Sequence, residues 1–377
     1  MTAPRPQAPP RARPLRIAVS LLSFRPGLVG GAETYLRALL EHLPGEVGHD
    51  RLVAVMDRDL AAALPTPGFE RAVLDASARR LVAGRVLEAF TPLRARAAER
   101  LFASLRADVA LFPQQSIFPA RVTVPAVLTV VDVQHLVFPE YFPLFDRLYR
   151  PRVYPRSMAA ACRIIAISEF TKAELVARCG VAPEKVVAIP LGVTPFDPSA
   201  YSPYPGLETP YLYCPAATQP HKNHATLLES YAALRKAGRI PHRLVLSGMQ
   251  TEGWPALERR IAALGVEKDV RHLGFIPYSD VHRVYAGADA VVFPTRYEGF
   301  GLPVIEAARH RRRVIVSDIP VFRELGVPAE WRIDFADPEQ LAAALARAGP
   351  TRLEKEPATW AECARRTVEV LRGVAAG

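Results

Sequence analysis

The chain has 377 residues and half of them are hydrophobic, which is enough for two domains with a buried core each. No apolar run approaches ~20 residues, so no membrane-spanning helix is expected. The four cysteines are scattered without zinc-type or redox spacing, and we expect a reduced, cytoplasmic protein.

The formal net charge of +10 is uneven along the chain. Residues 1–195 carry 25 Lys/Arg against 17 Asp/Glu, so they hold +8 of it. This excess indicates an anionic partner: a phosphorylated acceptor, an anionic membrane surface or nucleic acid. A solvated arginine-rich surface explains the charge equally well. No zinc-finger spacing or RNA-binding aromatic motif is present, so nucleic acid is not expected.

Residues 1–14 are rich in proline and arginine and lack the apolar segment of a signal peptide, so we expect a disordered tail. Apolar runs and amphipathic helices then alternate over residues 15–193, which predicts a parallel sheet flanked by helices. Gly30 and Gly31 join the first strand to its helix in a turn that would let the backbone approach a phosphate. The expected strands are 15–22, 51–56, 108–112, 126–131, 163–167 and 186–192, and the expected helices are 32–43, 81–105 and 141–161.

Two segments of this half carry candidate side chains. Asp57 and Asp59 follow a strand and could hold a divalent cation, although an exposed loop is favoured. His135 follows the strand 126–131, at the end where open α/β sheets bind ligands. It could contact a leaving phosphate or a sugar hydroxyl, or be purely structural.

A basic aromatic stretch follows at residues 145–163 and could lie on anionic lipid headgroups. Pro151 and Pro155 argue against one continuous amphipathic helix there. An ordinary surface is the alternative. Ser168 is expected to cap the helix that starts at Glu169.

Five prolines between residues 194 and 210 indicate an inter-domain linker, placed at 194–209. A second α/β alternation covers 210–357, with strands expected at 211–214, 243–246, 270–273, 290–293 and 314–317. Two Rossmann-like domains facing a central cleft are therefore predicted, and residues 358–377 form an amphipathic C-terminal helix.

Lys222, with His221 beside it, precedes a helix that is expected to begin near residue 225. A cation next to bare backbone amides is suited to stabilise a departing diphosphate. The chain has only six lysines among 48 basic residues, which makes a lysine at this place more notable.

The most informative string is FPTRYEGFGLPVIE, at residues 293–306. A buried strand is followed by a glycine loop, and Pro303 is expected to open a helix. The amides of Gly299, Phe300, Gly301 and Leu302 would face an anion. Glu298 and Glu306 could accept hydrogen bonds from sugar hydroxyls. The alternative is a plain strand–helix turn whose carboxylate offsets the helix dipole.

The string EGFGLPVIE resembles the signature of retaining, nucleotide-sugar-dependent GT-B glycosyltransferases of family 4 (group 1). The DVQHLVFPEYF segment at 132–142 and the PHKNH segment at 220–224 are similar to the family's other motifs. The PHKNH form resembles bacterial polysaccharide and O-antigen mannosyltransferases. The chain departs from the family pattern in two places. The family's arginine is missing at 216–218, unless His221 replaces its charge. The family's Gly/Pro turn is replaced by residues 307–313, where Arg311, Arg312 and Arg313 could add charge near the nucleotide.

The resemblance implies a retaining, metal-independent, cytoplasmic hexosyltransferase with no cofactor. Its donor is a nucleotide diphosphate sugar, with GDP-mannose favoured, and its acceptor is a glycan or a lipid-linked hydroxyl. His135, Lys222 and Glu298 are the implied catalytic residues, and the C-terminal helix is expected to cross back onto the N-terminal domain. Peripheral contact with the inner face of an anionic membrane through the basic domain is also expected.

The alternatives are a non-catalytic GT-B binding subunit and a nucleotide-sugar isomerase on the same fold. The residues implied to bind the nucleotide sugar are Gly30, Gly31, His221, Lys222, Gly248, Ile276, Glu298, Gly299, Phe300, Gly301, Leu302 and Glu306.

Overall fold

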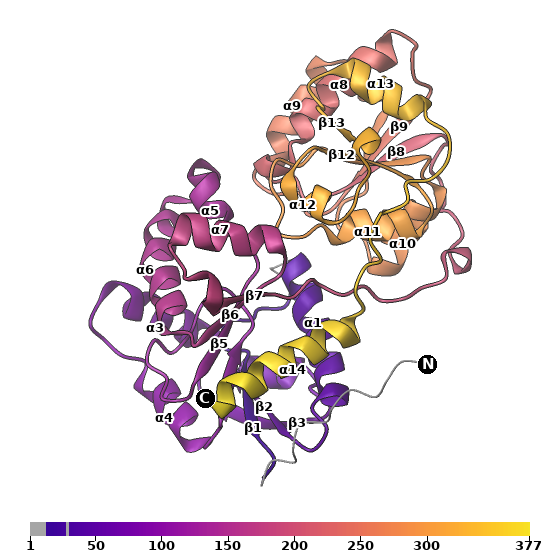
Figure 1. Ribbon diagram of the computed structural model, residues 1–377. Coiled ribbons are helices and arrows are strands. Elements are labelled where there is room, and N and C mark those ends of the chain that lie inside the picture. Colours follow the sequence, from indigo (N-terminus) through magenta and orange to yellow (C-terminus); the bar gives the residue numbers. More distant parts are fainter. Residues whose placement is uncertain (1–12, 28–29) are drawn as a thin grey trace, which may run out of the picture.

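The chain folds into two α/β domains, each built on one parallel sheet (Figure 1). The computed structural model describes residues 13–27 and 30–377. Most of the tail expected at 1–14, and two residues of the loop before Gly30, therefore lie outside the described residues. The predicted class, two Rossmann-like domains, is confirmed.

The N-terminal sheet has seven strands in the order β3-β2-β1-β4-β5-β6-β7. Its strands are β1 (Arg16–Ser20), β2 (Arg51–Asp57), β3 (Phe69–Leu74), β4 (Val109–Phe112), β5 (Ala126–Val130), β6 (Arg163–Ala166) and β7 (Val186–Ala188). Its helices are α1 (Gly31–Glu46), α2 (Arg58–Ala63), α3 (Ala78–Phe90), α4 (Arg96–Ser104), α5 (Gln134–Val137), α6 (Leu144–Ala160) and α7 (Glu169–Cys179).

The C-terminal sheet has six strands in the order β10-β9-β8-β11-β12-β13. Its strands are β8 (Tyr211–Pro215), β9 (Arg243–Ser247), β10 (Val270–His272), β11 (Ala290–Phe293), β12 (Arg313–Ser317) and β13 (Arg332–Ile333). The helices are α8 (His224–Lys236), α9 (Trp254–Ala263), α10 (Tyr278–Gly287), α11 (Leu302–Arg309), α12 (Pro320–Glu324), α13 (Pro338–Ala346) and α14 (Trp360–Ala376).

The central strands are apolar throughout because helices cover both faces of each sheet. All four residues of β11 are buried, as are all five of β5. Continuous apolar runs therefore predicted these strands well. The weaker strands β3 and β13 were missed, since five of the six residues of β3 are not fully buried and β13 has only two residues.

The last helix returns to the N-terminal domain, where α14 packs along α1 (Figure 1). Arg372 Nε donates to Asp50 Oδ2 at 2.9 Å, and Val193 pairs with Thr359 in an isolated parallel bridge. Two chain segments, the linker and the segment before α14, therefore connect the domains.

Three local expectations were wrong. The helix expected at 81–105 is split into α3 and α4 around Pro92. Asp57 is fully buried, because Oδ1 caps α2 through Leu60 N and Oδ2 pairs with Arg25 at 3.0 Å. Helix α6 runs unbroken through Pro151 and Pro155. Both prolines are exposed and four residues apart, so the carbonyls that lose their partners can be solvated on one face.

Candidate functional site

The predicted motifs follow the carboxyl ends of neighbouring strands. In the C-terminal sheet the strand order reverses between β8 and β11, and such switch points are where open α/β sheets bind ligands. The PHKNH loop follows β8 and the EGFG loop follows β11. The fold therefore places these two motifs beside each other.

The two loops are joined through the backbone of His221. Arg296 N donates to the His221 carbonyl oxygen at 2.8 Å, and Thr295 Oγ1 donates to the same oxygen at 3.2 Å. Burial, with the nearby Lys222 charge as the next cause, lowers the pKa of the His221 ring to about 3. A ring with this pKa is neutral at pH 7, so the structure does not support the expectation that His221 replaces the missing arginine charge.

Lys222 and Glu298 form an ion pair across these loops, between Nζ and Oε1. Their side chains are 17% and 15% exposed, so the pair is largely shielded yet still reachable by solvent. Asp132, from the loop after β5 of the other domain, lies close enough to respond to both charges. Burial raises the pKa of Asp132, the Gln134 amide and Arg150 lower it, and Glu298 raises it further.

His135 lies in the short helix α5 and is buried. Its ring packs edge-on against Tyr154 at 5.1 Å and Phe142 at 6.4 Å between centroids, and its Nδ1 has no hydrogen-bond partner. Burial, followed by the charge of Arg150, lowers the pKa of His135 to about 4. At neutral pH this imidazole can donate or accept a hydrogen bond without carrying charge.

Glu306 is buried in α11 and both of its oxygens accept hydrogen bonds from tyrosines. Tyr278 Oη donates to Oε1 at 2.7 Å and Tyr285 Oη to Oε2 at 3.3 Å. Burial raises the pKa of Glu306, while the two tyrosine hydrogen bonds lower it. Each carboxylate oxygen can accept a further hydrogen bond, because a carboxylate offers about four lone-pair positions.

The glycine loop touches the N-terminal domain directly. The carbonyl oxygen of Gly299 accepts hydrogen bonds from Ser168 Oγ at 2.7 Å and Thr171 Oγ1 at 3.3 Å. A Cβ on Gly299 would clash with the carbonyl oxygen of Val131. Gly301 caps α11 at φ +109°, a backbone conformation that favours glycine.

Two further contacts join the domains beside this loop. Val133 N donates to Tyr297 Oη at 3.3 Å, so the segment that carries Asp132 and His135 is fixed to the segment that carries Glu298. The Glu324 carboxylate accepts from the amides of Glu169 and Phe170, each at 2.8 Å, at the start of α7. The expected Ser168 cap of α7 is confirmed, with Thr171 N donating to Ser168 Oγ at 2.9 Å.

The remaining expected binding residues lie around this group. Phe300 and Leu302 are buried, so their amides rather than their side chains could meet a ligand. Gly248 and Ile276 follow β9 and β10, and Gly248 N donates to Gly274 O at 2.9 Å. Gly30 caps α1 and Gly31 begins it. Among the described residues, no hydrogen bond or ion pair links Gly30 or Gly31 to Glu298 or Lys222.

The arginines after Glu306 lie away from this group. Arg312 Nη1 donates to Ala288 O at 3.0 Å and Arg313 pairs with Asp289, both at the amino end of the sheet. His310 instead joins a buried aromatic cluster and lies 2.8 Å from His282, measured from Nε2 to Nδ1. The expectation that these arginines add charge near the nucleotide is therefore wrong. Arg311 adopts φ 56°, the left-handed conformation of a turn between α11 and β12.

The described part of the chain brings together no group of three or more His, Cys, Asp or Glu side chains suited to a metal ion. It also contains no helix long and apolar enough to cross a membrane.

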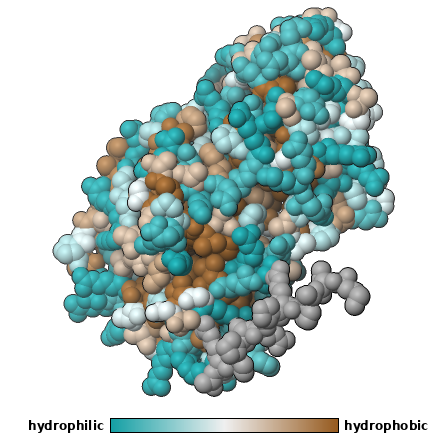
Figure 2. All heavy atoms as spheres, viewed as in Figure 1, coloured by the Kyte–Doolittle hydropathy of each residue, from teal (hydrophilic) through white to brown (hydrophobic). Residues whose placement is uncertain are grey.

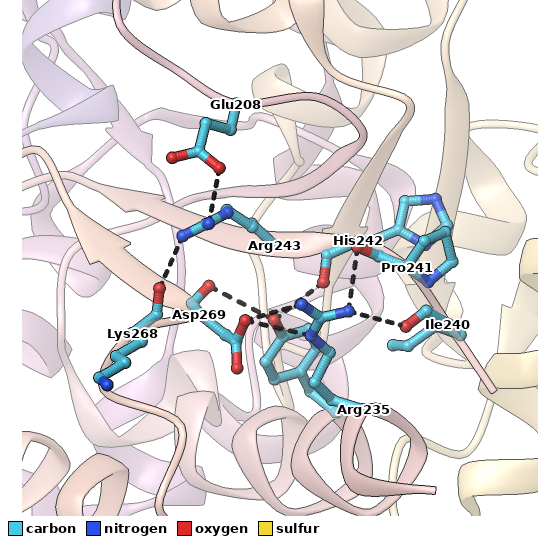
Figure 3. Close-up of polar contacts among 9 residues, drawn as sticks. Glu208, Arg235, Ile240, Pro241, His242, Arg243, Lys268 and Asp269 are labelled. Carbon is cyan, nitrogen blue, oxygen red and sulfur yellow. Dashed lines mark hydrogen bonds and ion pairs between the residues drawn. The ribbon is translucent and has the colours of Figure 1, made fainter. Parts of the chain in front are cut away.

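A cavity of about 280 Å³ lies elsewhere, at the start of β9 and β10. Figure 3 shows polar contacts beside it: the lining residue Asp269 pairs with Arg235 of α8, Arg243 pairs with Glu208, and Arg243 Nη1 donates to the Lys268 carbonyl oxygen at 2.7 Å. This cavity lies at the amino ends of its strands, whereas open α/β sheets bind ligands at the carboxyl ends, so we place the site at the motif loops.

Sequence reasoning missed three residues of this group. Asp132 stood inside a recognised motif, but nothing local indicated that it would approach a charge pair of the other domain. Tyr278 and Tyr285 are seven residues apart, two turns along one helix face, and that spacing was the available signal.

Comparison with known proteins identifies the family of the chain. The models "Glycosyltransferase Family 4" and "Glycosyl transferases group 1" match residues 29–195 and 205–367. The O-antigen chain mannosyltransferase B of Escherichia coli is 28% identical over 222 residues, which are 56% of this chain and 58% of that protein. The O-antigen chain mannosyltransferase RfbU of Salmonella typhimurium is 27% identical over 193 residues, 51% of this chain and 52% of that protein. The chain thus spans about half the length of the curated relatives it matches.

Among solved structures, HepE of Anabaena, in complex with UDP and glucose, superposes with a TM-score of 0.64 at 19% identity, covering 96% of each chain. That likeness shows the fold, and the two family models leave out only the termini and a short part of the linker. The chain belongs to the group 1 glycosyltransferases of family 4, with the GT-B fold.

Proposed function

We propose that this chain is a retaining transferase that moves mannose from GDP-mannose to a hydroxyl of a glycan or lipid-linked acceptor. The observation that carries the proposal is the Lys222–Glu298 ion pair, held beside Asp132 where the two domains meet. The likeness to O-antigen mannosyltransferases supports the choice of sugar and acceptor class.

In this proposal Lys222 neutralises the departing diphosphate. The amides at the start of α11, from Gly299 to Leu302, supply further donors at a positive helix end. Charge that develops on the leaving group is stabilised most when the donors are fixed in advance and shielded from water. The hydrogen bonds from Thr295 Oγ1 and Arg296 N to the His221 carbonyl oxygen provide that fixation for the Lys222 loop.

The carboxylates hold the neutral parts of the donor. Glu306 accepts the ribose hydroxyls, with Tyr278 and Tyr285 keeping its carboxylate oriented. Glu298 accepts hydroxyls of the transferred sugar. The neutral imidazole of His135 holds the sugar near the breaking bond.

The reaction proceeds on one face of the sugar. The acceptor oxygen bonds to the anomeric carbon as the bond from that carbon to the diphosphate oxygen breaks. The hydroxyl proton passes to the departing diphosphate on the same side, so the anomeric configuration is retained. No described side chain is assigned as a covalent nucleophile, and the proposal requires neither metal nor cofactor.

The test begins with thermal stabilisation by GDP, UDP, dTDP and ADP, with and without EDTA. We expect the largest shift with GDP, unchanged by EDTA and lost in Glu306→Ala, whereas Glu258→Gln, an exposed control, behaves as wild type. Incubation with GDP-mannose and a mannosylated acceptor should then release GDP and give an α-linked product.

Each of the other possible outcomes would overturn one part of the proposal or favour an alternative function. A product with inverted configuration would overturn the retaining mechanism, and activity abolished by EDTA would overturn metal independence. Nucleotide binding without GDP release in the presence of any acceptor would favour a non-catalytic binding subunit. Turnover of the nucleotide sugar without an acceptor would favour an isomerase.

A further inference from the structure

The start of helix α7 in the N-terminal domain is capped by side chains from both domains. The first amides of a helix have no partner within it. The Thr171 amide donates to Ser168 Oγ of the same domain at 2.9 Å. The amides of Glu169 and Phe170 donate to the Glu324 carboxylate, each at 2.8 Å, and Glu324 is the last residue of α12 in the C-terminal domain. The opposite domain therefore supplies the acceptor for two of these three amides.

The Glu324 contact depends on charge and has a fixed direction. Oε1 accepts from the Glu169 amide and Oε2 from the Phe170 amide, so the carboxylate lies across the end of the helix in one orientation. The amino end of a helix is its positive end, and hydrogen bonds to an ionised acceptor are about twice as strong as neutral ones. Lys355 Nζ donates to the Glu324 carbonyl oxygen at 2.9 Å, which fixes the end of α12 from its own domain.

The start of α7 also holds the glycine loop. The carbonyl oxygen of Gly299 accepts from Ser168 Oγ and from Thr171 Oγ1. The loop after β11 and the end of α12 therefore reach the same helix start from two places in the C-terminal domain. Helices α7 and α12 also contact each other and face one another across the junction of the domains (Figure 1). Two contact points fix an angle as well as a distance, because a rotation about one of them breaks the other.

On the visible face, the junction of the domains lacks a large apolar contact. Figure 2, viewed from the same side as Figure 1, shows mostly hydrophilic and intermediate residues where the two domains meet. Polar interfaces between domains permit relative motion by default. Directed polar contacts such as the one at Glu324 therefore have a large share in setting how the domains are aligned.

This alignment determines the geometry of the candidate site. Helix α7 follows β6, and Asp132 and His135 follow the neighbouring strand β5. Lys222 and Glu298 come from the other domain and form the ion pair described above. We propose that Glu324 is a positioning residue for transfer, which caps α7 from the opposite domain and so keeps these two halves of the site in register. The role in transfer rests on the proposed function, whereas the capping contact can be tested without any substrate.

The experiment is hydrogen–deuterium exchange of the full chain, followed by transfer kinetics. Glu324→Gln keeps the shape of the side chain but replaces one acceptor oxygen by a donor. We expect the amides of residues 169–172 to exchange at least about tenfold faster, as for the loss of one charge-assisted hydrogen bond. The turnover number kcat should fall by a similar factor of about ten, while nucleotide affinity stays unchanged. Glu324→Asp keeps the charge and should lie between wild type and Glu324→Gln. The control is Glu330→Gln, an exposed residue of the same domain, which should behave as wild type.

Wild-type exchange at residues 169–172 in Glu324→Gln would overturn the proposal. So would wild-type kcat, or an equal loss of kcat and nucleotide affinity, because Glu324 would then serve only the fold of its own domain. An absence of transfer by the wild-type chain would instead overturn the proposed function and leave the expected change in exchange standing. Melting of each variant and unchanged exchange in β11 exclude misfolding as the cause.

Discussion

Breaking the Lys222–Glu298 ion pair should cost stability and activity in different ways. Lys222→Met leaves the Glu298 carboxylate, 15% exposed, beside Asp132 without its cation. Opposite charges about 4 Å apart attract by about 4 kcal/mol at an effective dielectric constant near 20. The cost of desolvating the two groups offsets part of this attraction. We therefore expect a coupling energy of about 2 kcal/mol, which lies between the values typical of exposed and of fully buried ion pairs.

A double-mutant cycle measures this coupling. Lys222→Met and Glu298→Gln should each lower the unfolding free energy by about 2 kcal/mol, which is a fall of about 4–8 °C in the melting temperature of the C-terminal domain. The double variant should lose little more than either single variant, because both singles remove the same contact. Arg239 and Glu339, an exposed ion pair of the same domain, serve as the control cycle and should show no measurable coupling.

Turnover should respond differently. Lys222→Met should lower kcat by about 10²–10³, the usual cost of removing a group that stabilises developing charge. Glu298→Gln should not restore that loss of turnover in the double variant. Destabilisation by the double variant equal to the sum of the singles would refute the contact, and wild-type turnover of Lys222→Met would remove Lys222 from the reaction.

Three further outcomes are expected. Glu306→Gln should weaken nucleotide binding by about 30-fold or more in calorimetry, since two charge-assisted hydrogen bonds are lost; unchanged affinity would end its assignment to the ribose. Gly299→Ala should lower transfer at least tenfold and spare nucleotide affinity, because its Cβ clashes with Val131 O, whereas Gly373→Ala, with open space around it, should have wild-type activity. Burial holds the pKa values of His135, His221, His224 and His310 between about 3 and 4, below an unfolded value near 6.5. The unfolded chain therefore binds more protons in this range, and the melting temperature should fall as pH drops from about 6.5 towards 4; a rise would contradict the buried neutral state of these rings.

Much of the fold could be predicted from the sequence because each central strand is an uninterrupted apolar run. Val291 and Val292 have side chains on opposite faces of the sheet, and both are fully buried. Such a strand must have helices on both sides, which predicts a parallel sheet without any knowledge of its neighbours. The two-residue strand β13 carries no such signal, because its pairing to β12 depends on a contact with a strand already in place.

Proline was the most misleading local signal. Pro151 and Pro155 each remove a helical hydrogen bond, so the sequence, although it predicts a helix over 141–161, argues against one continuous amphipathic helix there. In the structure Val153, Ser157 and Met158 of the same helix are buried, and Ser157 Oγ accepts from Ile117 N at 3.0 Å. Tertiary packing on one face thus outweighs the loss on the solvated face, and this balance cannot be calculated from the helix by itself.

The sequence predicted those parts of the candidate site that depend on residues close together in the chain. The loop after β11 and the helix that follows it depend on a few consecutive residues, and the sequence signalled both. The pairing of Lys222 with Glu298 spans 76 residues, and the hydrogen bond from Ser168 to Gly299 spans 131. Long-range contacts of this kind follow from how strands are ordered and how domains meet, which no local pattern encodes.

The contact at Gly299 gives the glycine loop a second role. Its carbonyl oxygen accepts from Ser168 and Thr171 of one domain, while the amides that follow it lie at the start of α11 in the other. Any side chain at this position would hold the domains apart at the place where donor and acceptor must meet. Glycine is therefore required here for domain approach as well as for access of a ligand to the backbone. Under the proposed function, a substitution should accordingly impair transfer, which uses both domains, before it impairs nucleotide binding, which the proposal assigns to the C-terminal domain.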